Sequence, residues 1–298
     1  MDTHSVVTIG VFDGVHLGHQ ALIGHCVEIA RANGLRSVAV TFDPNPLEVL
    51  RPEVAPTRLC EIDRRVDLIR TLGVDQVEVL AFDADMAAMS ADEFVKDVLH
   101  KRLKAEHVVI GHGFRFGHKA AGSADTLRSG GLSVDEYSLV GDQQPVSSTR
   151  IRSAVAVGDV VLAASMLGRS PEVEGVVETG QKRGRDLGFP TANIGHHRLA
   201  AVPADGVYAG TATVGDRSHI AAISVGTNPT FEGARRTVEA YLLDFDGDLY
   251  GQRLRVGFTT RLRDTLAFDG IEQLVAQMDA DVERVNSIFR TGVEQSAD

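Results

Sequence analysis

Cysteines and long apolar runs are scarce in this sequence. Only two cysteines, Cys26 and Cys60, occur in 298 residues, and both fall in helix-like segments. Such low cysteine usage is typical of a reducing compartment, so we expect no structural disulfide. Residues 1–5 are too short and polar for a signal peptide, and no apolar run approaches the ~20 residues that span a membrane. These absences predict a cytoplasmic protein with no membrane partner.

Blocks of positive charge are missing as well. The formal net charge is −11, and no stretch is rich in lysine or arginine. A protein that binds nucleic acid carries a basic patch or stripe, so we expect no nucleic-acid partner. The densest basic cluster, at residues 182–185, is short and lies among glycines. Such a cluster suits a small phosphate ligand better than a duplex.

The first part of the chain alternates short apolar runs with amphipathic stretches. This pattern predicts a parallel, doubly wound, Rossmann-like α/β sheet. The expected strands are 6–11, 37–42, 77–82, 107–110 and 133–140. The expected helices are 20–33, 62–72 and 91–102, and the last has a capping box at Ser90 and Glu93. We place this first domain at residues 1–168.

Strands dominate after residue 168. Short apolar runs separated by Asp-Gly and Asn-Pro turns predict a compact antiparallel β-barrel. The expected strands are 173–178, 206–214, 219–225, 237–244 and 253–260, and adjacent His196 and His197 are expected in a surface turn. Apolar residues at helical spacing between 271 and 289 predict a C-terminal helix that packs on the barrel. We place this second domain at residues 169–298.

A glycine-rich turn follows the first expected strand and leads into the first expected helix. Residues 10–19 read Gly-Val-Phe-Asp-Gly-Val-His-Leu-Gly-His. Strand, glycine-rich turn and helix start together aim backbone N–H groups and the positive end of a helix dipole at an anion. His16 and His19 can donate N–H groups to a phosphate. A plain turn with two surface histidines is the alternative for such a motif alone. The candidate nucleotide-binding residues are Gly10, Phe12, Asp13, Gly14 and Gly18.

Two further stretches carry polar side chains suited to phosphates. Residues 146–152 read Val-Ser-Ser-Thr-Arg-Ile-Arg, where the hydroxyl groups of Ser147, Ser148 and Thr149 can either cap a helix or hold a phosphate oxygen. Arg152 can clamp a triphosphate there. Residues 180–193 form a glycine-arginine loop that runs into Pro-Thr-Ala-Asn.

These motifs resemble those of one family. The turn at 10–19 is similar to the H-x-G-H nucleotidylyltransferases, and in its full form it resembles the adenylyltransferase half of bacterial bifunctional riboflavin kinase/FAD synthetases. Residues 146–152 resemble the second motif of that half, and 180–193 resemble the riboflavin kinase signature. The resemblance implies phosphorylation of riboflavin to FMN and adenylylation of FMN to FAD, with ATP as co-substrate and Mg²⁺ at both steps.

The resemblance also implies roles for individual residues. In the first domain, His16 and His19 would contact the ATP phosphates, Arg152 the triphosphate, and Ser148 and Thr149 phosphate oxygens. In the second, Gly180, Gly184 and Arg185 would approach phosphates, while Thr191 and Asn193 offer hard oxygen ligands suited to Mg²⁺. Glu239 would be the general base for the riboflavin 5′-hydroxyl. Flavin contacts are expected at Phe114, Phe116, Asn228 and Thr230.

The sequence departs from the family pattern at two positions. Gly113 stands where the family usually carries Asn or Asp, and Asn45 stands where it carries His. Loss of a side chain that stabilises a transition state costs roughly 10²–10³ in rate. The alternative function is therefore a riboflavin kinase whose first domain is a flavin- or nucleotide-binding regulatory lobe without turnover. An H-x-G-H enzyme of tRNA aminoacylation would need a basic surface and a long anticodon-binding region, which this chain does not have.

Overall fold

A computed structural model describes residues 4–138, 146–179, 187–230 and 233–295, without the side chains of 228–230, 233–235 and 292–295. Its contacts divide into two compact units, one of Met1–Pro56 and Glu61–Ser147 and the other of Thr57–Cys60 and Ser148–Asp298. This division places the two helices that follow residue 147 with the second unit, whereas the domain boundary expected at 168 stays a prediction. Each unit is described by itself.

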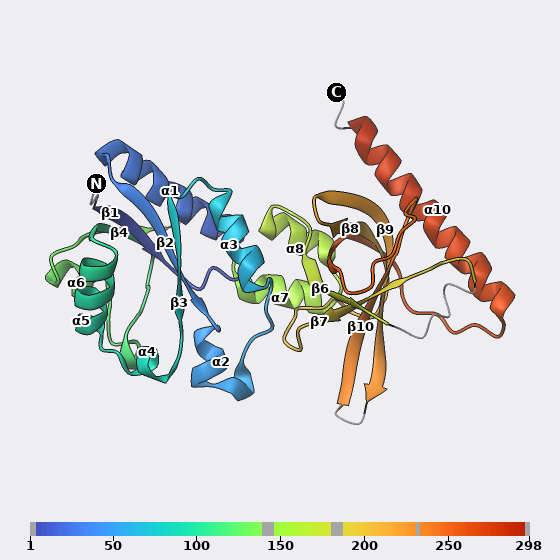
Figure 1. The fold of residues 1–298 in the computed structure, drawn as a ribbon, viewed down its shortest axis with the longest axis horizontal. Helices are drawn as coiled ribbons and strands as arrows, with labels where there is room; N and C mark the ends of the chain where they lie inside the picture. Colours follow the sequence, from blue (N-terminus) through green and yellow to red (C-terminus); the bar gives the residue numbers. More distant parts are fainter. Residues whose placement is uncertain (1–3, 139–145, 180–186, 231–232, 296–298) are drawn as a thin grey trace. The chain divides into compact units, whose positions relative to one another are not determined.

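The first unit is a parallel five-stranded sheet with helices on its faces (Figure 1). Its strands lie in the order β3-β2-β1-β4-β5, with bounds β1 Ser5–Ile9, β2 Arg36–Asp43, β3 Gln76–Ala81, β4 Ala105–Gly111 and β5 Ser133–Tyr137. From β1 the chain adds β2 and β3 on one side of β1, and then β4 and β5 on its other side. The strand order therefore switches between β1 and β4. In such sheets a ligand binds outside the carboxyl ends of the strands at this switch point. The loops that follow β1 and β4 therefore mark the candidate site.

Two cores cover the two faces of this sheet. Side chains alternate along β1, so that Val7 joins the cluster around Leu99 while Val6 joins the cluster around Ile23. The helices of this unit are α1 Leu17–Asn33, α2 Pro46–Leu50, α3 Ile62–Arg70, α4 Ala84–Ala88, α5 Ala91–Glu93 with its π-helical continuation Phe94–Arg102, and α6 Ala124–Ser129; short 3-10 turns lie at Pro52–Val54 and His118–Ala120. Buried residues of α1 and α3 belong to the cluster around Ile23, and those of α5, its continuation and α6 belong to the cluster around Leu99. Cys26 and Cys60 are free and buried, and burial raises the pKa of the Cys26 thiol to about 12.

The second unit contains a closed antiparallel barrel in the order β10-β7-β6-β11-β8-β9. The strand bounds are β6 Glu172–Glu178, β7 Ala192–His196, β8 Gly206–Val214, β9 Arg217–Thr230, β10 Gly233–Leu242 and β11 Arg253–Arg263. Helices α7 Ser148–Ala156 and α8 Val160–Leu167 precede the barrel, and α10 Ile271–Gln295 runs along its outside (Figure 1). The expected combination of barrel and C-terminal helix is confirmed.

Alternation along the barrel strands separates an inner core from an outer surface. Val238 and Ala240 face the buried interior with Ile223 and Val225, whereas Tyr241 packs with α10 on the outside. Glu239 therefore belongs to the outer face, on the side that α10 covers. Glu239 is thus a half-buried carboxylate within the apolar stretch 238–242.

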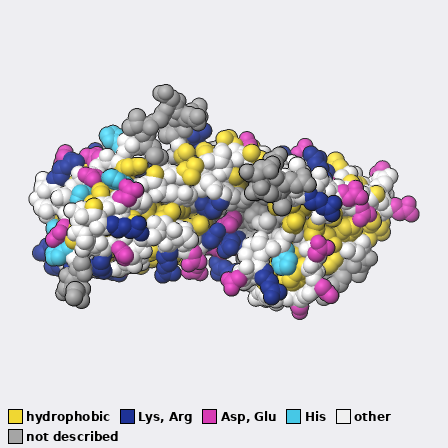
Figure 2. Space-filling view, turned by 90° about the horizontal axis from the view of Figure 1, so that it is seen from above, with side chains coloured by type: hydrophobic (Ala, Val, Ile, Leu, Met, Phe, Trp, Pro, Cys, Tyr) yellow, Lys and Arg dark blue, Asp and Glu magenta, His cyan; other side chains and the backbone are white. Residues whose placement is uncertain are grey.

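The distribution of surface charge and the character of the helices can be compared with the expectation of no nucleic-acid and no membrane partner. On the face shown in Figure 2, Lys and Arg side chains are interspersed with Asp and Glu and do not gather into a basic stripe. Among the helices of the described ranges, none has the length and apolar character needed to cross a membrane.

Candidate active sites

The glycine-rich turn after β1 is held in an unusual backbone conformation. Phe12 and Val15 have φ of 51° and 40°, in the left-handed region that residues with a Cβ avoid. Phe12 is nevertheless buried, and its ring lies so close to Gly10 that a Cβ there would come within 2.7 Å of Phe12 Cε1. The Thr41 hydroxyl donates to the Val11 carbonyl at 2.8 Å and fixes the turn from the neighbouring strand. The surrounding structure thus holds the turn in shape before a ligand arrives.

His16 and His19 come together at the start of α1. His16 is the N-cap residue, and its Nδ1 accepts a hydrogen bond from the backbone N–H of His19 at 3.3 Å. Their rings stack with centroids 3.6 Å apart at an interplanar angle of 18°. Because Nδ1 of His16 is an acceptor here, the neutral ring carries its hydrogen on Nε2. One ring nitrogen thus orders the helix start, and the other is an N–H donor.

A buried ion pair lies under this turn, and sequence reasoning missed its cation. Arg65 of α3 and Asp13 of the turn have side chains that are each 3% exposed, with Arg65 Nη2 3.9 Å from Asp13 Oδ1. Arg65 Nη1 also donates to the Phe42 carbonyl at 3.0 Å. The guanidinium therefore links the turn after β1 to the end of β2. Arginine is rarely buried without such partners. The sequence did not reveal this pair because Arg65 and Asp13 are far apart in the chain and meet only in the folded structure.

The loop after β4 contains one of the two departures from the family pattern. Gly113 has φ of +74°, and a Cβ added there would meet nothing within 4 Å. Phe114 is partly exposed and stacks on Phe116 with ring centroids 5.9 Å apart. Phe116 is itself buried in the core beside Phe94. Of the two flavin contacts predicted in this loop, Phe114 is thus the more accessible ring, and Phe116 packs against it from the core.

The second departure, Asn45, has a local structural role. Its side-chain Oδ1 accepts from the backbone N–H of Leu47 at 3.0 Å and caps α2. Asn45 is itself buried, with 8% exposure. Asparagine is among the residues that helix N-termini prefer. The substitution for His thus leaves a well-capped helix after β2.

The residues predicted to hold phosphates beside the histidines divide between the two units. Ser147 ends the first unit, and Ser148 begins α7 in the second. Arg152 Nε donates to the Thr57 carbonyl at 2.6 Å within the second unit. The grouping of Ser147, Ser148, Thr149 and Arg152 with His16 and His19 stays a prediction.

In the second unit, three of the predicted residues meet on the outer face of the barrel. The Thr191 hydroxyl donates to Glu239 Oε2 at 3.0 Å. Asn193 lies directly opposite Glu239 in the pairing of β7 with β10, and directly opposite residues share a face of the sheet. The Thr191 hydroxyl and the Glu239 carboxylate are therefore in contact, and Asn193 is their neighbour on the same face of the sheet. This arrangement can hold a hard cation and accept a proton at one place.

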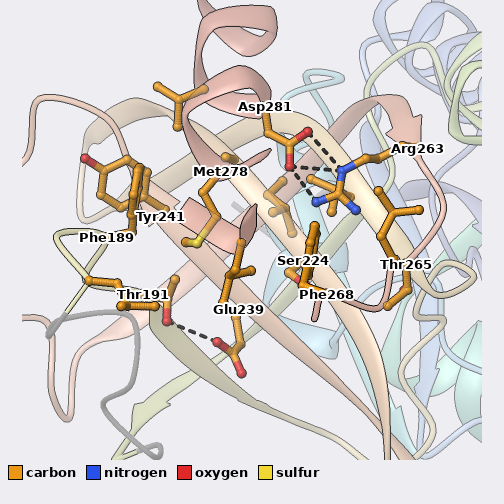
Figure 3. A pocket seen from close by; sticks show the side chains of 17 residues that line it. Phe189, Thr191, Ser224, Glu239, Tyr241, Arg263, Thr265, Phe268, Met278 and Asp281 are labelled. Carbon is orange, nitrogen blue, oxygen red and sulfur yellow. Dashed lines mark hydrogen bonds and ion pairs between the residues drawn. The ribbon is translucent and has the colours of Figure 1, made fainter. Parts of the chain in front are cut away.

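An apolar pocket of about 350 Å³ adjoins this cluster (Figure 3). Its aromatic and aliphatic walls come from the barrel, from residues 264–270 and from the first turns of α10, and include Phe189, Tyr241, Phe268, Leu274 and Met278. Glu239 and Thr191 line one part of it, and Arg263 and Asp281 line another. Pockets for small ligands are typically ≈300–1,000 Å³, mostly apolar, with a few placed polar groups. The expected apolar stripe of the C-terminal helix thus lines a pocket with its first turns as well as packing on the barrel.

Some predicted residues fall outside what the structure describes. Gly180, Gly184 and Arg185 lie in the range 180–186, and the side chains of Asn228 and Thr230 are also outside the described part. Their assignments stay predictions.

A doubly wound sheet whose first helix begins beside a glycine-rich turn, and a barrel with a hydroxyl–carboxylate pair beside an apolar pocket, are the features expected of a two-unit, nucleotide-handling enzyme. Comparison with known families agrees with this class. A model described as FAD synthetase matches residues 1–151, and one described as riboflavin kinase matches residues 167–289.

Individual relatives match over nearly their whole length. A bifunctional riboflavin kinase/FMN adenylyltransferase of Pseudomonas fluorescens is 40% identical, covering 93% of this chain and 90% of the relative. The Bacillus subtilis enzyme of that name is 34% identical, and the match covers 96% of this chain and 92% of the relative. A Streptococcus pneumoniae structure described as a macrolide-efflux protein superposes with a TM-score of 0.86 at 33% identity. The match covers 96% of this chain and 95% of that structure's chain. This chain belongs to the family of bifunctional riboflavin kinase/FMN adenylyltransferases.

Proposed function

We propose that this chain performs both reactions that give its family its name. Riboflavin is phosphorylated to FMN in the second unit, and FMN is adenylylated to FAD with the glycine-rich turn of the first. ATP is the co-substrate of both reactions. The observation that carries the kinase assignment is the Thr191–Glu239 hydrogen bond of 3.0 Å at the edge of an apolar pocket. Cytoplasmic location stays an expectation from composition.

Glu239 is the general base of the kinase reaction. The oxygen of the riboflavin 5′-hydroxyl attacks the γ-phosphorus of ATP, the bond to ADP breaks, and the hydroxyl proton passes to Glu239. An alcohol is a poor nucleophile until it loses its proton, so a placed carboxylate contributes roughly 10²–10⁴ in rate. The pocket beside Glu239 has the apolar walls that a flavin ring needs. Phe189 and Tyr241, whose ring centroids are 5.4 Å apart, give it an aromatic side.

Thr191 and Asn193 are the proposed ligands of Mg²⁺ in this unit. Their oxygens are hard donors, and the neighbouring carboxylate of Glu239 adds negative charge. Bound at that place, Mg²⁺ would neutralise phosphate charge during the transfer. The glycine-arginine loop with Gly180, Gly184 and Arg185 is the proposed cradle for the ATP phosphates. Asn228 and Thr230 remain proposed flavin contacts.

Adenylyl transfer needs charge stabilisation and no base. An oxygen of the FMN phosphate attacks the α-phosphorus of ATP and pyrophosphate leaves, and the attacking group is already an anion. The Nε2–H of His16 and the ring of His19 stabilise the phosphates at the helix start. Ser148, Thr149 and Arg152 bind the remaining phosphate oxygens, and Phe114 lies along the flavin.

A time course with the purified protein, riboflavin, ATP and Mg²⁺ tests this function. Chromatographic separation of the flavins is expected to show FMN first and FAD later. FMN that accumulates without FAD, even when FMN and fresh ATP are supplied, would favour the alternative in which the first unit is a regulatory lobe. No flavin product at all would contradict both assignments.

A further inference from the structure

The otherwise apolar pocket of the second unit has one strongly polar end. Arg263, at the end of β11, lines it together with Asp281 of α10. Arg263 Nη2 donates to Asp281 Oδ2 at 2.6 Å, and Nε lies 3.0 Å from Oδ1. In Figure 3 this pair lies at one end of the view and the Thr191–Glu239 pair at the other, with Met278 between them. The two polar groups thus bracket the apolar space.

Internal partners hold the guanidinium in place but leave part of it unused. Nη1 of Arg263 donates to the Asp264 carbonyl at 2.9 Å, in addition to the bonds to Asp281. An arginine has five N–H groups in a fixed plane. Two of them, one on each Nη, have no acceptor among the residues that the structure describes. They belong to a side chain that is 19% exposed and borders the pocket.

Asp281 is fixed in turn by a second donor. Gln277, one turn earlier on α10, donates from Nε2 to Asp281 Oδ1 at 3.0 Å. The carboxylate is buried, with 6% exposure of its residue, and it balances the arginine charge. Because Asp281 holds the Arg263 guanidinium in one orientation, that guanidinium loses little conformational freedom when it donates to a ligand oxygen. The pair therefore resembles a prepared recognition element more than a solvated surface contact.

We infer that Arg263 is a specificity-determining residue for riboflavin, donating an N–H to a carbonyl oxygen of the pyrimidinedione ring. This inference rests on the proposed flavin site. The ribityl chain must bring its 5′-hydroxyl to Glu239, so the ring system fills the space between Glu239 and Arg263. Its dimethylbenzene end is apolar and its pyrimidinedione end carries two carbonyls. The apolar walls and the single cationic corner fit those two ends respectively. Asp281 is a positioning residue that orients the guanidinium.

A purely structural link between α10 and β11 is the competing explanation, and the chain offers a matched control for it. Arg284 also ties α10 to the end of β11, donating from Nη1 to the Leu262 carbonyl at 3.1 Å. Unlike Arg263, it is not among the residues that line the pocket. Both arginines therefore link the same two elements, but only Arg263 borders the proposed flavin site.

The test compares KM and kcat for riboflavin in full-length Arg263→Met, Arg263→Lys, Asp281→Asn and Arg284→Met. We expect Arg263→Met to raise KM roughly 10- to 100-fold with kcat within about threefold, because a hydrogen bond to a charged group is lost. Arg263→Lys keeps the charge and the fold but loses the planar fork, so a smaller rise in KM is expected. Asp281→Asn should also raise KM. Arg284→Met should lower thermal stability and leave KM unchanged.

Flavin analogues give a readout that a structural link would not move. Sulfur accepts hydrogen bonds less well than oxygen, so replacing the C2 or C4 carbonyl oxygen with sulfur should raise KM for the native protein at one of the two positions. In Arg263→Met that discrimination should vanish. Equal KM increases in Arg263→Met and Arg284→Met, or discrimination that persists without Arg263, would overturn the inference. Glu239→Gln changes kcat and not KM, so failure of the base assignment would be seen separately.

Discussion

Nδ1 of His16 accepts the backbone N–H of His19 at 3.3 Å, and the His16 ring stacks on that of His19. The same imidazole thus caps α1 and, through its tautomer, presents an N–H at Nε2. These two roles can be separated by a substitution, because asparagine caps helices well but has no atom at the position of Nε2.

His16→Asn should therefore lower the rate of FAD formation by about 10²–10³ while leaving thermal stability unchanged. FMN formation should stay at the native rate, since the kinase residues are in the other unit. The measurement is the initial rate of each flavin by chromatography. His25→Asn, further along the same helix, is the matched control and should retain both activities. Native FAD synthesis in His16→Asn would rule out a catalytic role for the ring.

Glu239→Gln tests the proposed base of the kinase reaction. Gln can still accept the Thr191 hydroxyl hydrogen bond, so the local structure should persist, but it cannot take a proton. We expect kcat for FMN formation to fall by about 10²–10⁴ with little change in the KM for riboflavin. FAD formation from supplied FMN should be unaffected. Near-native kinase turnover would show that Glu239 is not the base.

Gly113→Asn tests whether the departure in the loop after β4 limits adenylyl transfer. A Cβ at this position meets nothing within 4 Å, and Asn tolerates the left-handed φ of +74° better than most residues. We expect the variant to fold and to form FAD faster than the native protein. Gly113→Ala is the matched control, because it also places a Cβ at the left-handed φ but adds no side-chain amide. Its rate of FAD formation should not rise above that of the native protein. A rate that does not rise in Gly113→Asn would mean that the missing side chain is not limiting.

Arg65→Met tests the buried pair under the glycine-rich turn. Removing one partner of a buried ion pair typically costs about 3–5 kcal/mol of folding stability. We expect a loss of that size in the unfolding of the first unit, followed by denaturation with the second unit's transition as internal reference. Arg70→Met, on the same helix with 65% side-chain exposure, should change stability by less than about 0.5 kcal/mol. Equal stabilities of the two variants would contradict the proposed role of Arg65.

Periodicity located most of the regular elements. The helix expected at 20–33 is α1, which begins three residues earlier at Leu17 because the His16 side chain caps it. The capping box at Ser90 and Glu93 is present, although the helix continues in π form. β7 was not expected, since the short run at Ala192–His196 has no apolar alternation strong enough to mark a strand.

Tertiary contacts account for what the sequence could not reveal. The surface position expected for His196 is wrong, because the residue is 7% exposed and its Nε2 lies 2.9 Å from the Arg236 carbonyl of β10. The pairs Arg65–Asp13 and Arg263–Asp281 join separate elements, so no local pattern announces them. Glu239 and Thr191, by contrast, were predicted from motifs, and the structure shows them hydrogen-bonded where β7 pairs with β10.

Complementation between two variants, each impaired in one reaction, tests most directly whether the chain holds two separate catalytic sites. Glu239→Gln and His16→Asn are each incubated with riboflavin, ATP and Mg²⁺, alone and mixed, and the flavins are separated over time. Alone, the first should make FMN and FAD only at the strongly reduced kinase rate, and the second should accumulate FMN. Mixed, they should make FAD, because FMN released by one protein is used by the other. A mixture that makes no FAD although each variant is folded, or a single substitution that abolishes both FMN formation and FAD formation from supplied FMN, would contradict two independent sites.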